Sequence, residues 1–342
     1  MNAADLSIII PVFNRGAEVI RYTLESVRRA SAGLSVETII VDDGSNPPTA
    51  ETLARLGFAP SALVRQANQG LLYARLAGFA RATGRNVLFL DSDDLVSPEK
   101  FRLQLAAMDA SGADISYSDT AHCEISGDFD ALTPTPDAPA RDTTDATEFC
   151  LVVQPPPHSP IFRTDWLRRA VAAACFPPSP LYNNVAEIWF YHNAAPRAGR
   201  VVHVPGPHTI VGRHPGARLT DSWEKLAIGS LAVMEAFSRS CPATAATART
   251  RRLVGEVAFR SWRRLPRGFS PEYCERIIAL WRRLAPGRSP ALGGGFFRAL
   301  ALFLGPESTA RLFHRVQSHP YAACRTMSDA DFAKLLSVLP PT

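Results

Sequence analysis

The sequence predicts an α/β fold in which a mostly parallel β-sheet is flanked by helices and followed by a helical region. Short β-branched runs alternate with stretches of helical spacing through about residue 120, which is the pattern of βαβ units. Polar side chains directly follow three of these runs, as expected at the carboxyl edge of a parallel sheet, where ligands bind. From about residue 221 onward the pattern is helical only.

The elements can be assigned in chain order from the period of the apolar residues. The predicted strands are 6–12, 36–41, 62–64, 86–90, 113–117 and 201–204. The predicted helices are 18–30, 49–56, 70–82, 99–110, 162–174 and 188–194, followed after Trp223 by helical pieces broken at Pro242, Pro266, Pro286 and 293–295. Residues 126–147 are rich in Pro, Asp, Thr and Ala and have no apolar period, so they predict a long loop or a lid.

Length and composition indicate an ordinary globular protein. The 342 residues predict one large domain, residues 1–220, and a smaller helical region, residues 221–342. Six scattered cysteines without a C-x-x-C pair argue against a zinc module or a disulfide scaffold and fit a reducing compartment. We see no signal peptide and no apolar run of membrane-spanning length, and therefore expect a cytoplasmic protein, soluble or peripheral to the inner face of the membrane.

The net charge of +5 is unevenly spread, since arginines far outnumber acids between Arg239 and Arg315. A basic half of this kind suits an anionic membrane surface, an acidic substrate or nucleic acid, and it also occurs as a solvated helical face. We expect no nucleic acid partner. Docking on the first domain is the default role for this region, with a homodimer contact or peripheral membrane contact as the alternatives.

An acidic cluster, Asp91-Ser92-Asp93-Asp94, stops the predicted strand 86–90. Carboxylates gathered in one small volume repel one another unless a cation is present, and Mg²⁺ or Mn²⁺ held partly by substrate phosphates is the usual solution. An isolated D-x-D is more often a solvated turn that caps the next helix. A second acidic turn, Asp42-Asp43, lies at the same predicted sheet edge and favours the metal hypothesis.

Four segments occur in an order and spacing that resemble the successive motifs of family 2 glycosyltransferases with the GT-A fold. The segments are IIIPVFN at 8–14, IVDDGS at 40–45, NQGLLYAR at 68–75 and FLDSDD at 89–94. The resemblance covers about residues 5–120 and continues more weakly to about residue 220. It implies a Rossmann-like, mostly parallel sheet, with a donor half at about 5–120 and an acceptor half at about 121–220.

The resemblance assigns a nucleotide-binding role to residues at the sheet edge. Pro11 and Phe13 would flank the base, beside Asn14, although the family more often has tyrosine at position 13. Asp42 or Asp43 would accept a hydrogen bond from a base N–H, which favours a uracil-like edge.

The resemblance also assigns the metal and the diphosphate. Arg75 would lie near the diphosphate or base, Asp91 would contact the ribose or the water shell of the metal, and Ser92 would belong to the same donor site. Asp93 would bind Mn²⁺ or Mg²⁺ directly, Asp91 would share that metal, and His214 would be a third ligand or a phosphate contact.

A transferase also needs a base for the acceptor hydroxyl. The matching stretch here is 184–190, in which Glu187 is the candidate catalytic base and Ala186 replaces a second acid that the family often has. Asp165 is the next candidate.

The resemblance implies an inverting transfer of a sugar from a nucleotide-diphosphate sugar, UDP-linked by expectation, to a saccharide or lipid-linked hydroxyl in cell-surface polysaccharide biosynthesis. Two alternatives stay open. A nucleotidyltransferase would need a glycine-rich basic loop after the first strand, where this chain has Phe13-Asn14-Arg15-Gly16. A binding protein without turnover would keep the nucleotide site alone.

Overall fold

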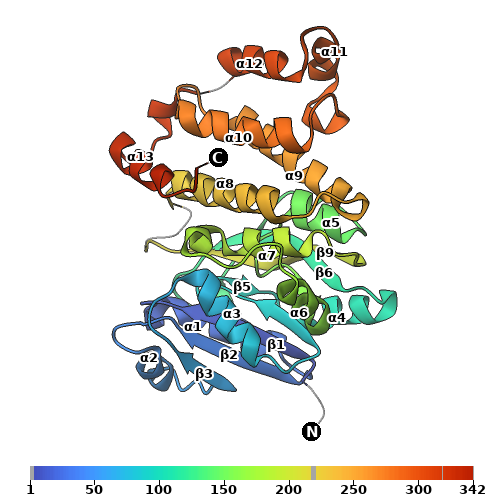
Figure 1. Cartoon of the computed structure of the whole chain (residues 1–342). Coiled ribbons are helices and arrows are strands. Elements are labelled where there is room, and N and C mark those ends of the chain that lie inside the picture. The colour runs from blue at the N-terminus through green and yellow to red at the C-terminus, as the bar shows by residue number, and fades with distance from the viewer. Residues whose placement is uncertain (1–3, 217–220, 318, 342) are drawn as a thin grey trace. The chain divides into compact units, whose positions relative to one another are not determined.

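The computed structural model describes residues 4–216, 221–317 and 319–341, which divide into two compact units (Figure 1). The first unit comprises residues 1–174 and 197–216. The second comprises residues 175–196 and 217–342. The contacts thus group residues 175–196 with the C-terminal unit, whereas the sequence-based boundary at residue 220 stays a prediction.

The first unit alternates strands and helices along its N-terminal half. In chain order it contains β1 (Leu6–Val12), α1 (Ala17–Ala30), β2 (Val36–Asp42), α2 (Thr49–Arg55), β3 (Ala62–Arg65), α3 (Leu71–Arg81), β4 (Asn86–Phe89), β5 (Leu95–Val96) and α4 (Lys100–Ser111). It continues with β6 (Ile115–Glu124), η1 (Phe129–Ala131), β7 (Thr135–Pro136), α5 (Ala146–Glu148), η2 (Phe149–Val153), β8 (Ile161–Arg163), α6 (Thr164–Ala172) and β9 (Val201–Arg213).

The strands of this unit form one sheet in the order β3-β2-β1-β4-β8-β6-β9-β5, with β7 paired to β6. The first four strands in this order are parallel, as the βαβ pattern predicts. Beyond them β8 pairs antiparallel with both β4 and β6, and β5 pairs antiparallel with β9. The sheet is therefore parallel in the N-terminal half and mixed in the other half.

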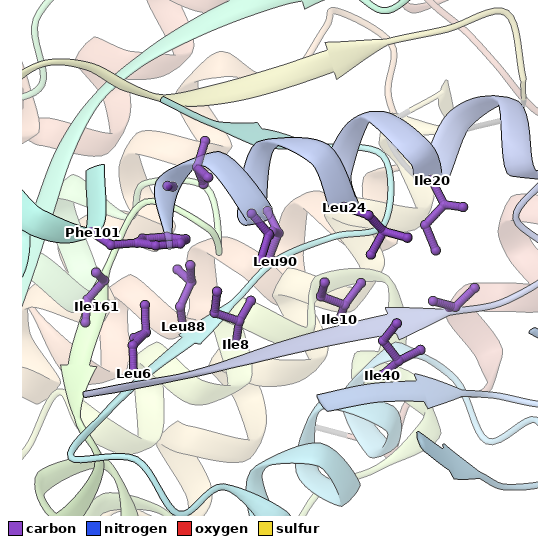
Figure 2. Packing of buried hydrophobic residues seen from close by; sticks show 14 of the residues in the cluster. Leu6, Ile8, Ile10, Ile20, Leu24, Ile40, Leu88, Leu90, Phe101 and Ile161 are labelled. Carbon is purple, nitrogen blue, oxygen red and sulfur yellow. The ribbon is translucent and has the colours of Figure 1, made fainter. Parts of the chain in front are cut away.

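One face of the sheet packs against α1 and α4 (Figure 2). Alternate residues of β1, among them Ile8 and Ile10, are fully buried and point toward Ile20 and Leu24 of α1. Phe101 of α4 closes the same layer. All seven residues of β1 are buried, as a strand covered on both faces requires, because successive side chains point to opposite sides.

The opposite face receives α3, and a glycine permits the close approach. A Cβ added to Gly78 would lie 2.4 Å from Cγ2 of Ile9 and 3.0 Å from Cγ2 of Val41. Only glycine therefore lets this turn of α3 rest on β1 and β2. The helix that carries Arg75 is in this way held directly against the sheet.

Four sequence-based assignments differ from the structure. The strand expected at 113–117 begins at Ile115 and extends to Glu124. The strand expected at 201–204 extends to Arg213, because Pro205, Gly206 and Pro207 interrupt the apolar pattern without ending the strand. The helix expected from 162 begins at Thr164, and the residues before it form β8. The expected loop 126–147 contains η1 and β7, short elements without an apolar period of their own.

The second unit is helical, as expected. It contains η3 (Pro180–Val185), α7 (Ala186–Ala194), α8 (Trp223–Ser240), α9 (Ala245–Arg264), α10 (Pro271–Leu284), η5 (Pro290–Leu292), α11 (Gly295–Leu304), α12 (Pro306–Gln317), η6 (Tyr321–Ala323) and α13 (Asp329–Ser337). The predicted breaks at Pro242, Pro266, Pro286 and 293–295 are confirmed, since each separates two helices or begins one. Within the described ranges, no helix combines the length and the apolar character needed to cross a membrane.

Candidate functional site

The acidic cluster forms a tight turn between β4 and β5. The amide of Asp94 donates to the carbonyl oxygen of Asp91 at 3.1 Å, which closes the turn. Asp91 contacts Arg75 of α3. Asp93 instead contacts Arg15 and His214, which come from distant segments of the chain. The turn thus separates the two carboxylates that the D-x-D pattern places together in sequence.

Asp93 meets Arg15 and His214 in a three-residue cluster. Nη2 of Arg15 donates to Oδ2 of Asp93 at 3.0 Å. Nε2 of His214 lies 3.1 Å from the same oxygen and 3.1 Å from Nη1 of Arg15. The amide of Gly216 donates to Nδ1 of His214 at 3.0 Å, so Nε2 carries the proton of the neutral ring and donates to Asp93.

His214 reaches Asp93 because β9 runs past the acidic turn. The backbone amide of Gly212 donates to Oδ1 of Asp94 at 2.9 Å. A Cβ at Gly212 would lie 2.0 Å from the carbonyl oxygen of Asp93, so only glycine fits where the two segments cross. The pairing of β9 with β5 holds the same approach.

Asp91 is bound by a buried arginine. Arg75 is 1% exposed, and its Nη2 donates to Oδ1 of Asp91 at 2.7 Å. Asp91 itself is partly exposed. The pair therefore places a positive charge just behind a carboxylate that remains open to solvent, at the carboxyl edge of the parallel strands.

Asp43 connects the end of β2 to the start of α3. Its Oδ1 accepts from Nε2 of Gln66 at 2.7 Å and from the amide of Gln69 at 3.0 Å. Its Oδ2 accepts from the amide of Gly70 at 2.8 Å, directly before the helix that carries Arg75. Asp43 thereby positions α3, and its contact with a base stays a prediction.

Asp42 organises the next turn of the chain. Its carboxylate accepts from the amides of Ser45 and Thr49, at 2.8 and 3.1 Å, and from Arg65 at 3.2 Å. Burial raises the pKa of the Asp42 carboxyl, but the hydrogen bonds from Ser45 and Thr49 outweigh it and hold the pKa below its usual value. Asp42 is therefore ionised at neutral pH.

The segment after β1 presents an aromatic ring and a strained asparagine. Phe13 is 49% exposed, unusual for phenylalanine, and offers a free stacking surface. Asn14 has a left-handed backbone (φ 49°), and its side chain accepts from the amide of Asn46 at 2.8 Å. Pro11 and Ser92 are buried, Pro11 opposite Val41 within the sheet.

Asp94 faces inward. Its Oδ2 lies 3.1 Å from Nδ1 of the fully buried His158, without the alignment of a hydrogen bond. Burial lowers the pKa of His158 to about 3, so this imidazole is neutral at physiological pH. Asp94 and His158 thus form part of the packing beneath the turn.

The two candidate bases lie in different units. Glu187 is in the first turn of α7 and belongs to the second unit. Asp165 is in the first turn of α6, in the first unit, and is highly exposed, with Nη1 of Arg168 at 3.8 Å. The assignment of Glu187 as the base stays a prediction.

A metal would find two ligands rather than three. Among the described residues, no three His, Cys, Asp or Glu side chains gather closely enough to hold an ion by themselves. Asp93 and His214 nevertheless bring a carboxylate oxygen and an imidazole nitrogen within 3.1 Å, a donor pair that suits Mn²⁺. The residues therefore fit a metal whose other ligands come from a bound diphosphate.

Arg15 belongs to this cluster, although the sequence did not identify it as a candidate site residue. It directly follows Asn14 at the end of β1, and that position was its only sequence signal. Its partner residues lie 78 and 199 positions away, so the cluster exists only in the folded chain. A cavity of about 1140 Å³ is lined only by residues between Trp223 and Cys324 and includes none of these side chains.

Comparisons with known proteins find similarity to glycosyltransferases. Residues 7–171 match the family model described as glycosyl transferase family 2. A succinoglycan biosynthesis protein, ExoO, of Rhizobium meliloti is 32% identical over 124 residues, which cover 36% of this chain and 35% of that protein. Undecaprenyl-phosphate 4-deoxy-4-formamido-L-arabinose transferase of Pseudomonas paraeruginosa is 37% identical over 117 residues, covering 32% of this chain and 34% of that protein.

Solved structures extend the likeness to the whole chain. TarS residues 1–349 of S. aureus, in complex with UDP-GlcNAc, superposes with a TM-score of 0.65 at 17% identity, covering 95% of this chain and 93% of that one. The expected GT-A fold with a helical C-terminal region is confirmed by this match. The matches to the two relatives cover only about a third of their length. Residues 7–171, just under half of the chain, thus carry the similarity to glycosyl transferase family 2.

Proposed function

We propose that this protein transfers a sugar, with inversion, from a nucleotide-diphosphate sugar to a hydroxyl of a saccharide or lipid-linked acceptor, in the cytoplasm or at the inner face of the membrane. The donor nucleotide is UDP in this proposal. The acceptor would belong to cell-surface polysaccharide or glycan synthesis.

The observation that carries the proposal is the pair of charge clusters at the strand ends. Arg75 with Asp91, and Arg15 with Asp93 and His214, lie at the carboxyl edge of the sheet. Phe13, whose ring is exposed, follows β1 at the same edge. A diphosphate needs positive charge and metal ligands, and a base needs a stacking surface. These side chains supply both within one sheet edge.

The names of the relatives support the acceptor class that we propose. One is described as a succinoglycan biosynthesis protein and another as an undecaprenyl-phosphate sugar transferase. A solved structure with the same fold was obtained with UDP-GlcNAc. These three names support a nucleotide-sugar donor and an acceptor that is a polysaccharide or a lipid-linked sugar.

The proposed reaction is a direct displacement at the anomeric carbon. The acceptor hydroxyl oxygen forms a bond to this carbon while the bond to the diphosphate oxygen breaks, and the electron pair of that bond leaves with the nucleotide diphosphate. The hydroxyl proton passes to the carboxylate of Glu187. Arg75 and Arg15 stabilise the charge that develops on the leaving group.

Asp93 and His214 would hold a divalent metal against the diphosphate, and Arg15 would release Asp93 for this purpose. When bound, Mn²⁺ or Mg²⁺ would supply Lewis-acid neutralisation of the leaving group. Because a metal at Nε2 requires the ring proton on Nδ1, His214 would give up its hydrogen bond from Gly216 when the metal binds.

The test is a screen of UDP-, GDP- and TDP-sugars for hydrolysis with and without Mn²⁺. We expect turnover of a UDP-sugar, lost by about 100-fold or more in Asp93→Ala. A matched control is Asp137→Ala, because Asp137 also pairs with a histidine, His122, at 3.1 Å. Unchanged turnover in Asp93→Ala would refute the metal assignment.

The same screen, read together with UDP binding and with pyrophosphate release from UTP, separates the alternatives. A binding protein without turnover would bind UDP and hydrolyse none of the sugars. A nucleotidyltransferase would release pyrophosphate from UTP and a sugar phosphate. In this chain, Arg15 after β1 is committed to Asp93 rather than to a glycine-rich phosphate loop, which disfavours that second outcome.

A further inference from the structure

Helix α11 of the second unit exposes an apolar stripe. Phe296 is 76% exposed and Phe303 is 86% exposed, and Leu302 and Leu304 are exposed as well. The opposite side of the helix is covered, because Phe297 and Ala301 are buried. Phe297 packs beneath the guanidinium of Arg263, at 4.0 Å from the ring centroid. The helix is therefore anchored on one side and leaves its other apolar side open.

Helix geometry makes this open side continuous. Residues 296, 299 and 303 are spaced by three and four positions and share one face of the helix. Position 299 is alanine, so no polar group interrupts the stripe between the two phenylalanines. Large apolar side chains gathered in this way mark an interaction surface rather than ordinary scatter.

Arginines border the stripe. Arg298 is exposed and lies one turn before Leu302 on the same helix. Arg288 is exposed too, and its Nη2 donates to the carbonyl oxygen of Leu302 at 2.6 Å. No acidic residue occurs in α11. The exposed apolar face is thus edged with positive charge.

The surrounding sequence carries the same charge. Residues 245–315 contain fourteen arginines and four glutamates and no lysine or aspartate, a net charge of +10. The rest of the chain has 23 basic and 28 acidic residues, a net charge of −5. The positive charge of this protein is therefore concentrated around the helix that exposes phenylalanine.

We propose that α11 is an interfacial anchor that inserts Phe296 and Phe303 into an anionic lipid bilayer, with Arg298 and Arg288 at the headgroups. A helix that is apolar on its open side and edged with arginine lies in the plane of a membrane interface. Its ten residues fit this arrangement and are too few to span a bilayer. The arginines would bind the anionic headgroups, whereas an uncharged apolar partner would offer them no opposite charge.

A second copy of the chain suits this surface less well. In a two-fold symmetric dimer centred on the stripe, the arginines that border the stripe in one copy would lie close to the same arginines of the other copy. Like charges at such an interface oppose association. An anionic bilayer instead offers an apolar interior for the phenylalanines and negatively charged headgroups for the arginines.

The test is flotation of the full chain with vesicles of phosphatidylcholine alone or mixed equally with phosphatidylglycerol. We expect binding to the mixed vesicles that falls about ten-fold or more in Phe296→Ser/Phe303→Ser. Arg298→Glu should weaken binding by about five-fold or more, and added salt should act in the same direction. The control is Val338→Ser, which removes a valine of the same unit that is 59% exposed, and it should bind as the wild type does.

Folding of each variant is checked by circular dichroism and thermal unfolding, since all substituted side chains are solvent-exposed. Hydrolysis of a soluble UDP-sugar should be unchanged in these variants, so this test is separate from that of the proposed function. Absence of wild-type binding, or wild-type binding by the double phenylalanine variant, would overturn the anchor. A dimer that dissociates in the double variant, without vesicle binding by the wild type, would assign the stripe to a second copy.

Discussion

The guanidinium of Arg15 and the carboxylate of Asp93 form an ion pair across 78 residues of sequence, with Nη2 3.0 Å from Oδ2. His214 shares the same carboxylate oxygen. A positive side chain thus lies where the proposed reaction would need a metal. Whether arginine and metal compete for Asp93 can be measured directly.

Arg15→Ala should bind Mn²⁺ more tightly than the wild type. Removing Arg15 frees Asp93 from a competing cation, and a partly exposed ion pair of this kind corresponds to about a two- to five-fold change in affinity. Electron paramagnetic resonance of free Mn²⁺ gives the affinity, with Arg15→Lys as the charge-preserving control. Weaker Mn²⁺ binding in Arg15→Ala would show that the two cations do not compete.

Arg75→Ala should reduce both stability and donor turnover. The side chain is buried, so its loss leaves a gap and removes the partner of Asp91, at a cost of about 1–3 kcal/mol in the free energy of unfolding. Urea unfolding measures this cost. Arg75→Lys should recover part of the stability but less of the turnover, because lysine lacks the planar fork of donors. Full turnover in Arg75→Ala would remove this residue from the site.

Asp43→Ala should loosen the start of α3. Three hydrogen bonds, to Gln66, Gln69 and Gly70, are lost at once, which should lower the free energy of unfolding by about 2–4 kcal/mol. Asp43→Asn keeps one acceptor oxygen, so its free energy of unfolding should lie between those of the wild type and Asp43→Ala. Hydrogen exchange of the amide of Gly70 reports the change locally. An unchanged exchange rate in Asp43→Ala would mean that other contacts hold this loop.

Stability should fall as the pH is lowered from about 6.5 toward 3, in part through His158. Its pKa in the folded protein is about 3, below the unfolded value of about 6.5, so only the unfolded chain takes up the proton in this range. The slope for one proton is at most about 1.4 kcal/mol per pH unit. His158→Gln should flatten the dependence between about pH 6.5 and 5, where carboxyl groups contribute little.

The matched comparison for this prediction is His192, which is also buried and has a pKa lowered to about 4 by burial. His192→Gln should flatten the same range by a similar amount in the unfolding of the second unit. A pH dependence that is the same in wild type and His158→Gln would contradict the assignment. Urea midpoints across the pH series supply the measurement.

The local sequence by itself determined those strands and helix ends that do not depend on contacts with distant segments. The runs 6–12 and 86–90 are apolar enough to be buried on both faces of a sheet, so strand identity follows from composition and period alone. The breaks at Pro242, Pro266 and Pro286 follow from the missing amide of proline. The resemblance to family 2 glycosyltransferases and the carboxyl-edge placement of Asp91 and Asp93 also follow from the sequence.

Tertiary structure decided what each of those side chains contacts. Strand β9 continues through Pro205 and Pro207 because β6 and β5 supply pairing partners that no local pattern reveals, and this extension brings His214 to Asp93. Arg15 joins them from the end of β1, and Arg75 reaches Asp91 because Gly78 lets α3 rest on the sheet. Residue types and periods act over a few positions, whereas these contacts depend on the packing of segments far apart in the chain.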